Sequence, residues 1–246
     1  MENICKYKYE DYLDYMSRYD NGSGYEWITL NSQGWTKLIH DMLDERILAD
    51  FNLSPVKERC WARDYDNGRR PVISMFPVND MYATFEWGWN FEYIPRISGN
   101  KCVWARTDKS IYAHTFRLSD GFINGGKTEG YKESVFGRMS FKKPEEFGRI
   151  VEEIDRAYRY VNKDIKAYFE KTSTDTGMLT ELETIYDHKY YKFLHPENLL
   201  VKACLEKRMG MIEKAKEEFE EVTFRSDQLK EEYRKKIGFV ERLNSI

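Results

Sequence analysis

Apolar and polar side chains alternate along the chain from Met81 to Phe91. A period of two over this length predicts a long β-strand with one aromatic face and one polar face. The aromatic face carries four large rings, at about 150–250 Å² each, which together exceed the apolar patch that a soluble monomer usually exposes. We therefore expect a helix, a second sheet, a ligand or a partner to cover these rings, which belong to Phe85, Trp87, Trp89 and Phe91.

Short β-type segments on both sides of this strand predict an antiparallel meander. The turn at Asn67-Gly68 is the strongest short hairpin signal in the chain. The predicted strands are Tyr25 to Leu30, Lys57 to Arg63, Val72 to Val78, Met81 to Tyr93, Lys101 to Arg106, Ile111 to Leu118 and Tyr131 to Phe141. We expect Lys101 to Arg106 and Ile111 to Leu118 to form a hairpin with each other.

Apolar residues recur at intervals of three and four residues in two long segments, which predicts two amphipathic helices. The first runs from Trp35 to about Asp50, and a shorter helix is expected before it, from Lys6 to Arg18. The second begins at Pro144, where proline suits the first helical position, and runs to about Lys171. Its apolar stripe makes it the candidate cover for the aromatic face. The predicted fold class is therefore α+β, with a mainly antiparallel meander sheet of about five to six strands covered by amphipathic helices.

The remainder of the chain reads as helix throughout. A polar segment, Thr172 to Gly177, predicts a joint, so we expect an α+β domain over residues 1–171 and a helical region over residues 177–246. The helices are predicted at Met178 to Phe193, Pro196 to Arg208, Met211 to Val222 and Ser226 to Leu243. The last has only a thin apolar stripe, typical of a solvated outer helix or of a strip for self-association.

Composition narrows the classes of partner. The chain has 246 residues, of which 33% are charged, and a net charge of −3. This near balance gives no electrostatic reason to expect nucleic acid or a membrane as the partner. The first residues lack the apolar core of a signal peptide, and the four cysteines are scattered without metal-ligand spacing. We therefore expect a cytoplasmic protein with reduced thiols, no metal and no cofactor.

Motifs for catalysis are weak. The histidines at 40, 114, 188 and 195 are dispersed, and none has the spacing of a metal-binding helix. Gly125-Gly126-Lys127-Thr128 is similar to the end of a phosphate-binding loop, but no helix pattern follows it, so a hairpin loop is the better interpretation. Whether the protein is an enzyme stays open at this point, with the balance against it.

The polar face of the long strand is the candidate ligand or interaction surface. Successive residues on this face are about 7 Å apart, and carboxylates there could perform acid–base chemistry if one were desolvated. The simpler interpretation is an exposed sheet face, with charges balanced by Arg96, Arg106 or Arg117. The residues of this candidate surface are Tyr82, Thr84, Glu86, Asn90 and Glu92.

The order of these elements resembles a family of bacterial domains of unknown function, some of which are encountered near toxin–immunity loci. The resemblance covers roughly Trp35 to Phe169, and Asp50-Phe51-Asn52 stands where that family has Gly-Phe. It implies an antiparallel α+β fold and a non-catalytic role. Near the C-terminus, one helix pair with Ala203, Gly210 and Ala215 resembles a tetratricopeptide unit.

Two functions compete at this point. The first is a protein-interaction module, of which an immunity-like protein is one form, and it contacts another protein through the polar strand face or the helical tail. The second is a small-ligand-binding protein or enzyme with a pocket between the aromatic strand and the covering helix, using Glu86, Glu92 or His114.

Overall fold

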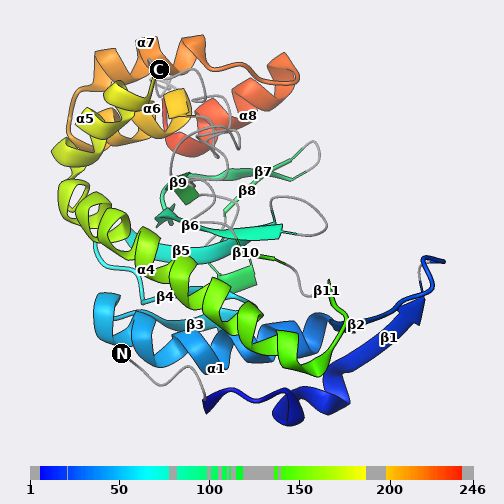
Figure 1. Cartoon of the computed structure of the whole chain (residues 1–246). Helices are drawn as coiled ribbons and strands as arrows, with labels where there is room; N and C mark the ends of the chain where they lie inside the picture. Colours follow the sequence, from blue (N-terminus) through cyan, green and yellow to red (C-terminus); the bar gives the residue numbers. More distant parts are fainter. Residues whose placement is uncertain are drawn as a thin grey trace, which may run out of the picture. The chain divides into compact units, whose positions relative to one another are not determined.

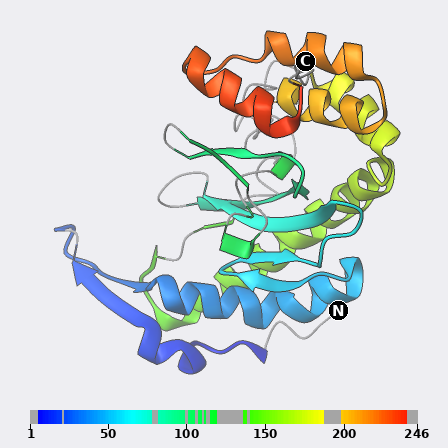
Figure 2. The same cartoon turned by 180° about the vertical axis from the view of Figure 1, so that it is seen from behind.

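A computed structural model of the chain describes residues 6–20, 22–77, 82–98, 101–104, 107–109, 111, 115–118, 136–137, 140–186 and 198–239 (Figures 1 and 2). The fold is α+β with antiparallel sheets, as the alternation and the helical periodicity predict. Every strand pair whose register is described is antiparallel. Among the described residues, no helix combines the length and apolar character needed to cross a bilayer.

The main sheet has the strand order β10-β6-β5-β4-β3, and β9 also pairs with β6. Both β9 and β10 pair with β6, but at different residues: β10 meets it at Tyr82 and Ala83, and β9 meets it from Trp87 to Asn90. The strands are β3 (Ser54–Lys57), β4 (Cys60–Ala62), β5 (Arg69–Pro77), β6 (Tyr82–Phe91), β9 (Thr115–Leu118) and β10 (Phe136–Gly137).

Two smaller sheets complete the β structure of the described residues. The first has the order β1-β2-β11, with strands β1 (Met16–Asp20), β2 (Glu26–Leu30) and β11 (Ser140–Phe141). The second is the pair β7 (Arg96–Ser98) and β8 (Lys101–Val103).

The described helices are the 3₁₀ segments η2 (Tyr9–Tyr15) and η4 (Pro144–Glu146), and the α-helices α1 (Ser32–Phe51), α4 (Phe147–Lys171), α5 (Asp175–Tyr186), α6 (Asn198–Arg208), α7 (Ile212–Glu221) and α8 (Asp227–Ile237). Asn31 caps α1 by accepting a hydrogen bond from the Gly34 N–H at 2.9 Å, and Ser226 caps α8 in the same way. Figures 1 and 2 show α6 and α7 side by side, joined at Gly210, whose φ is +83°. The predicted helix pair is therefore present.

The chain divides into two compact units, each built from several segments. Unit 1 contains residues 1–62, 73–86 and 119–166, and unit 2 contains residues 63–72, 87–118 and 167–246. The strands β5 and β6 and the helix α4 run through both units. The division into residues 1–171 and 177–246 stays a prediction.

The aromatic face of β6 is core in both units. Phe85, Trp87, Trp89 and Phe91 are all buried. In unit 1 the Phe85 ring lies 5.8 Å from the ring of Tyr158 on α4, and in unit 2 the Trp89 ring lies 5.5 Å from Phe169 on the same helix. The helix that begins after Pro144 therefore contacts this face, as its apolar stripe predicts.

Two predicted segments are different in the structure because strand pairing outweighs local preference. The residues expected to form a helix from Lys6 to Arg18 form η2 and then β1, which pairs with β2. The segment from Lys57 to Arg63, expected to be one strand, is divided between β3 and β4 at Arg59, whose φ is +54°.

The predicted hairpin between Lys101 to Arg106 and Ile111 to Leu118 is wrong. In the structure β8 pairs with β7, and β9 pairs with β6. The connection between Ser98 and Lys101 is only Gly99-Asn100, and such a two-residue Gly-Asn sequence favours a tight hairpin between its own neighbours.

In unit 1, helices α1 and α4 are joined through Asp50. Its carboxylate accepts hydrogen bonds from Tyr158 (2.8 Å), Asn162 (2.7 Å) and Lys166 (2.9 Å), which are spaced four residues apart on one face of α4. Burial alone would raise the pKa of Asp50, but the hydrogen bonds from Lys166 and Tyr158 lower it below its ordinary value of 3.8. The folded protein therefore favours the charged form of this carboxylate.

Because its pKa is lower in the folded protein, the Asp50 carboxylate should contribute to the free energy of unfolding over a defined range of pH. The contribution is complete above the pKa of Asp50 in the unfolded chain, and it is lost as the pH falls through the lower folded pKa. We expect Asp50→Ala to lower the free energy of unfolding at pH 7 by about 1 kcal/mol, since the site is partly exposed, and by less at pH 2. Urea denaturation between pH 7 and pH 2 measures this difference. The exposed Asp164→Ala on α4 is the control, and an equal loss from Asp50→Ala at both pH values would contradict the prediction.

Candidate functional site

The polar face of β6 is not the exposed surface that the alternation suggests. Thr84, Glu86 and Asn90 are buried, with Glu86 only 3% exposed, and Glu92 is half-buried. The side chain of Tyr82 lies outside the described part of the structure. A polar partner on the neighbouring strand explains the burial of Glu86: Ser74 on β5 donates a hydrogen bond to Glu86 Oε1 at 2.7 Å.

Asn90 lies in a buried polar cluster of unit 2 that includes Arg70. The Asn90 side-chain oxygen accepts hydrogen bonds from the Tyr65 hydroxyl and from Arg70 Nε, the latter at 3.2 Å. The Arg70 guanidinium lies 4.5 Å from the centre of the Tyr65 ring, and its Nη1 donates to Asp108 Oδ1 at 2.6 Å. Burial raises the pKa of the Tyr65 hydroxyl. The side chains of Arg96, Arg106 and Arg117, expected to balance this face, are not among those described; Arg70 is the arginine found here.

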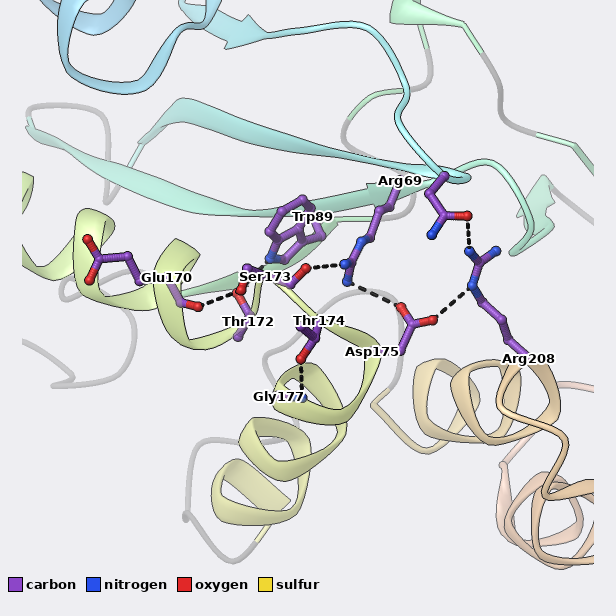
Figure 3. A network of polar contacts seen from close by, with 10 residues as sticks. Arg69, Trp89, Glu170, Thr172, Ser173, Thr174, Asp175, Gly177 and Arg208 are labelled. Carbon is purple, nitrogen blue, oxygen red and sulfur yellow. Dashed lines mark hydrogen bonds and ion pairs between the residues drawn. The ribbon is translucent and has the colours of Figure 1, made fainter.

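The adjacent residue, Arg69, belongs to a second polar network in unit 2 (Figure 3). Its guanidinium stacks on the Trp89 ring with a separation of 5.0 Å, donates to the Ser173 carbonyl oxygen and forms an ion pair with Asp175 at 3.2 Å. Asp175 also accepts a hydrogen bond from Arg208 Nε at 3.0 Å. Asp175 is the first residue of α5, so its negative charge also interacts favourably with the positive N-terminal end of that helix.

The segment predicted as a joint is an ordered turn within this network. Thr172 is fully buried, and its hydroxyl accepts a hydrogen bond from Trp89 Nε1 at 2.7 Å and donates one to the Tyr168 carbonyl. The Thr174 hydroxyl accepts from the Gly177 N–H at 3.0 Å, so Thr174 caps α5 (Figure 3). These contacts fix the start of α5 against the β6 strand, which is a structural role.

His40 in unit 1 has the partners of a structural histidine. Its Nε2 accepts the Arg59 backbone N–H at 3.2 Å, so the proton must be on Nδ1, which lies 2.8 Å from Asp44 Oδ1. Trp61 Nε1 donates to the same Asp44 oxygen at 2.7 Å. Both ring nitrogens are occupied, so His40 holds the β3–β4 turn and is not free to act as a base. His114, the histidine named for a ligand pocket, lies outside the described residues, as does the segment from Gly125 to Thr128.

The described cysteines are buried and reduced. Burial raises the pKa of the Cys102 thiol to about 11 and that of the Cys204 thiol to about 12. A thiol with such a pKa carries little thiolate at neutral pH and is a poor nucleophile or metal ligand. Across the described part of the chain, no three or more His, Cys, Asp or Glu side chains form a group that could hold a metal ion.

Among the described residues of unit 1, the most exposed aromatic side chains lie on or beside the small sheet β1-β2-β11. Tyr19 is directly opposite Trp27 in the β1–β2 register, and Ser17 is opposite Thr29, which is also opposite Ser140 on β11. Residues opposite each other share a face of a sheet. On the other face, Ile28, Leu30 and Phe141 are core residues. We name the first face the outer sheet face, defined by Ser17, Tyr19, Trp27, Thr29 and Ser140.

Two further residues complete this surface. Tyr25, just before β2, is 58% exposed, and Tyr19 is 43% exposed. The ammonium of Lys142, which follows β11, lies 4.0 Å from the centre of the Tyr25 ring and 5.0 Å from that of Trp27. The Tyr19 hydroxyl lies 3.0 Å from Ser140 Oγ, in hydrogen-bond contact. The surface is therefore aromatic, cationic and held in place by neighbouring side chains.

Sequence reasoning missed this surface because it placed a helix over the residues that form β1. Two signals pointed to it: the turn residues from Asp20 to Gly24, and the strand predicted from Tyr25 to Leu30. A short turn before a strand is typical of a β-hairpin, in which a second strand precedes the turn; here that strand is Met16–Asp20.

The other surfaces expected to face a partner are covered within the chain. The apolar stripe of α8 is buried at Leu229, Tyr233 and Ile237, and the Tyr233 hydroxyl donates to the Pro95 carbonyl. Glu232 on the same helix accepts a hydrogen bond from the Cys102 N–H at 3.1 Å. This places α8 on β8 in unit 2.

Comparison of the chain with protein-family models, with curated proteins and with solved structures finds no match.

Proposed function

We propose that this chain is a non-catalytic protein–protein interaction module, and that its contact surface is the outer sheet face with Tyr25 and Lys142. The observation that carries the proposal is the exposure of Tyr19 and Tyr25 beside Trp27 on one face of a small sheet. Tyrosine and tryptophan are enriched among the residues that dominate binding energy at protein interfaces.

Several features of this face favour a protein as its partner. Its aromatic rings lie on or beside paired strands, so little side-chain freedom is lost on binding. Small hydroxyl side chains at Ser17, Thr29 and Ser140 surround them and can form hydrogen bonds at the rim of an interface. The resemblance to domains near toxin–immunity loci supports a partner of that kind, which would make the protein immunity-like and place it in the bacterial cytoplasm.

The competing function, a ligand pocket at the aromatic strand, has less support. The rings that would line such a pocket, Trp87 and Trp89, are 3% and 5% exposed. They pack as core residues, so we do not propose a ligand site there. For the same reason we propose no self-association through the buried stripe of α8.

Site-specific photo-crosslinking tests the proposed function. A photoreactive phenylalanine analogue replaces Tyr25 and, as the control, the exposed Leu48 on α1, which is 49% exposed. We expect irradiation in the native host to yield one dominant protein adduct from position 25 and none from position 48. The same pattern of adducts from both positions, or no protein adduct at position 25 under several growth conditions, would contradict the proposal.

A further inference from the structure

We infer that the partner segment that docks on the outer sheet face carries a carboxylate that pairs with Lys142. The inference rests on the proposed function and adds the chemistry of the partner: an acidic stretch of polypeptide. Three observations support it: the position of Lys142, the distribution of charge between the two faces of the sheet, and the aromatic rings in contact with the ammonium.

Lys142 is a cation without an acidic partner in the described part of the chain. Its ammonium lies over the rings of Tyr25 and Trp27, and no described carboxylate forms an ion pair with it. One carboxylate oxygen of the nearby Glu146 accepts a hydrogen bond from the Lys142 backbone N–H at 3.0 Å, and this carboxylate forms no ion pair with the ammonium. The side chain is exposed, so the charge is accessible to another molecule.

The charges of the small sheet are separated between its two faces. The outer sheet face consists of serine, threonine, tyrosine and tryptophan, and in the described part of the chain the ammonium of Lys142 is the cation over the rings of Tyr25 and Trp27. Asp20 and Glu26 are opposite each other at the end of the hairpin, and Arg18 pairs with Glu26 at 3.4 Å. A single carboxylate placed among the aromatic rings therefore complements the outer sheet face.

This separation favours an acidic protein segment over nucleic acid. Binding of a phosphate backbone normally involves several cations along a groove. Among the described residues, Lys142 supplies the ammonium over the rings of Tyr25 and Trp27, and the two carboxylates of Asp20 and Glu26 at the hairpin end would repel a polyanion. A polypeptide can present one acid between apolar side chains, which suits Lys142 over the rings of Tyr25 and Trp27.

The aromatic rings also hold the Lys142 ammonium in a position where it can form an ion pair with a carboxylate. A cation held over the face of two rings is attracted to them, which limits the positions of its head group before binding. Less conformational entropy is then lost when a carboxylate arrives. Contact with the partner would also exclude water from the ammonium and strengthen the ion pair.

Selection from a random library of displayed peptides tests the inference with the intact protein. We expect the enriched peptides to contain more aspartate and glutamate than the starting library. For the best peptide, made synthetically, Lys142→Gln should weaken binding about fivefold, near the upper range for an exposed ion pair. Lys142→Arg should restore binding to within about twofold, and the neighbouring Lys143→Gln is the matched control and should have no effect.

The outcomes separate this inference from the proposed function. Peptides that depend on Tyr19 and Tyr25 but show no acidic excess and no effect of Lys142→Gln would overturn the inference and leave the interaction surface intact. Peptides that bind equally well to Tyr19→Ala and Tyr25→Ala variants would instead contradict the surface itself. Tight, Lys142-dependent binding of a thymidine oligonucleotide at physiological salt, with no enriched peptide, would overturn the acidic polypeptide in favour of nucleic acid.

Discussion

Replacing Trp87 by alanine is expected to lower the free energy of unfolding by about 3–5 kcal/mol. Trp87 lies on the aromatic face of β6 and is 3% exposed, so its removal deletes a large buried ring and leaves a cavity. Chemical denaturation followed by circular dichroism measures the loss. A variant as stable as the wild type would show that this face is open, and would restore the ligand pocket as the leading function.

The matched control for this change is Trp87→Phe. Phenylalanine keeps an aromatic ring in the core and removes the indole N–H, which is buried and has no hydrogen-bond partner among the described residues. We expect a loss below about 1.5 kcal/mol, as for hydrophobic substitutions that largely conserve volume. Equal losses from the alanine and phenylalanine variants would show that volume is not the cause.

Replacing Gly177 by alanine is expected to lower the free energy of unfolding by about 2–3 kcal/mol. A Cβ atom at this position of α5 would lie 2.2 Å from the carbonyl oxygen of Lys171, which is backbone and has little freedom to move. The strain would disturb the turn that holds Thr172 and Thr174. Helix propensity alone predicts the opposite sign, because alanine is favoured over glycine by about 1 kcal/mol.

Gly148→Ala on α4 is the control for the expected loss of stability in Gly177→Ala. A Cβ atom at Gly148 meets nothing within 4 Å, so only the helix propensity remains and we expect a gain of up to about 1 kcal/mol. Thermal or chemical denaturation of both variants compares them directly. A stabilised Gly177→Ala variant would show that the backbone at α5 does not approach as closely as the structure describes.

The sequence predicted the main elements where hydrophobic periodicity is long and regular. The alternation at β6, the stripe of α4 and the Asn67-Gly68 turn were each enough to predict structure, because each pattern depends on local geometry. Asn67 and Gly68 both have positive φ, at +52° and +77°, as a tight hairpin turn requires. Pairing between distant strands was harder, as the position of β9 beside β6 shows.

The polar face of β6 shows why a site is harder to predict than a strand. Alternation identifies which residues share a face, but it does not say what covers that face. Glu86 and Asn90 are polar and yet buried, because Ser74, Tyr65 and Arg70 supply partners from other parts of the chain. The period of two therefore predicted the face correctly and its exposure incorrectly.

The outer sheet face was missed for a related reason. Its residues come from β1, β2 and β11, and β11 is more than a hundred residues away from the other two strands along the chain. Each strand is short, and no single segment has a pattern that predicts the combined surface. Only the pairing of Tyr19 with Trp27 and the position of Lys142 over the rings of Tyr25 and Trp27 bring these residues together.

Hydroxyl-radical footprinting read by mass spectrometry tests the central claim most directly, because it reports the exposure of both aromatic surfaces in one experiment. In the purified protein we expect Tyr19 and Tyr25 to be oxidised readily while Trp87 and Trp89 are protected. In the complex isolated from the native host, Tyr19 and Tyr25 should become protected as well. Rapid oxidation of Trp87 and Trp89 in the free protein, or unchanged oxidation of Tyr25 in the complex, would contradict the assignment of the aromatic strand to the core and of the outer sheet face to partner binding.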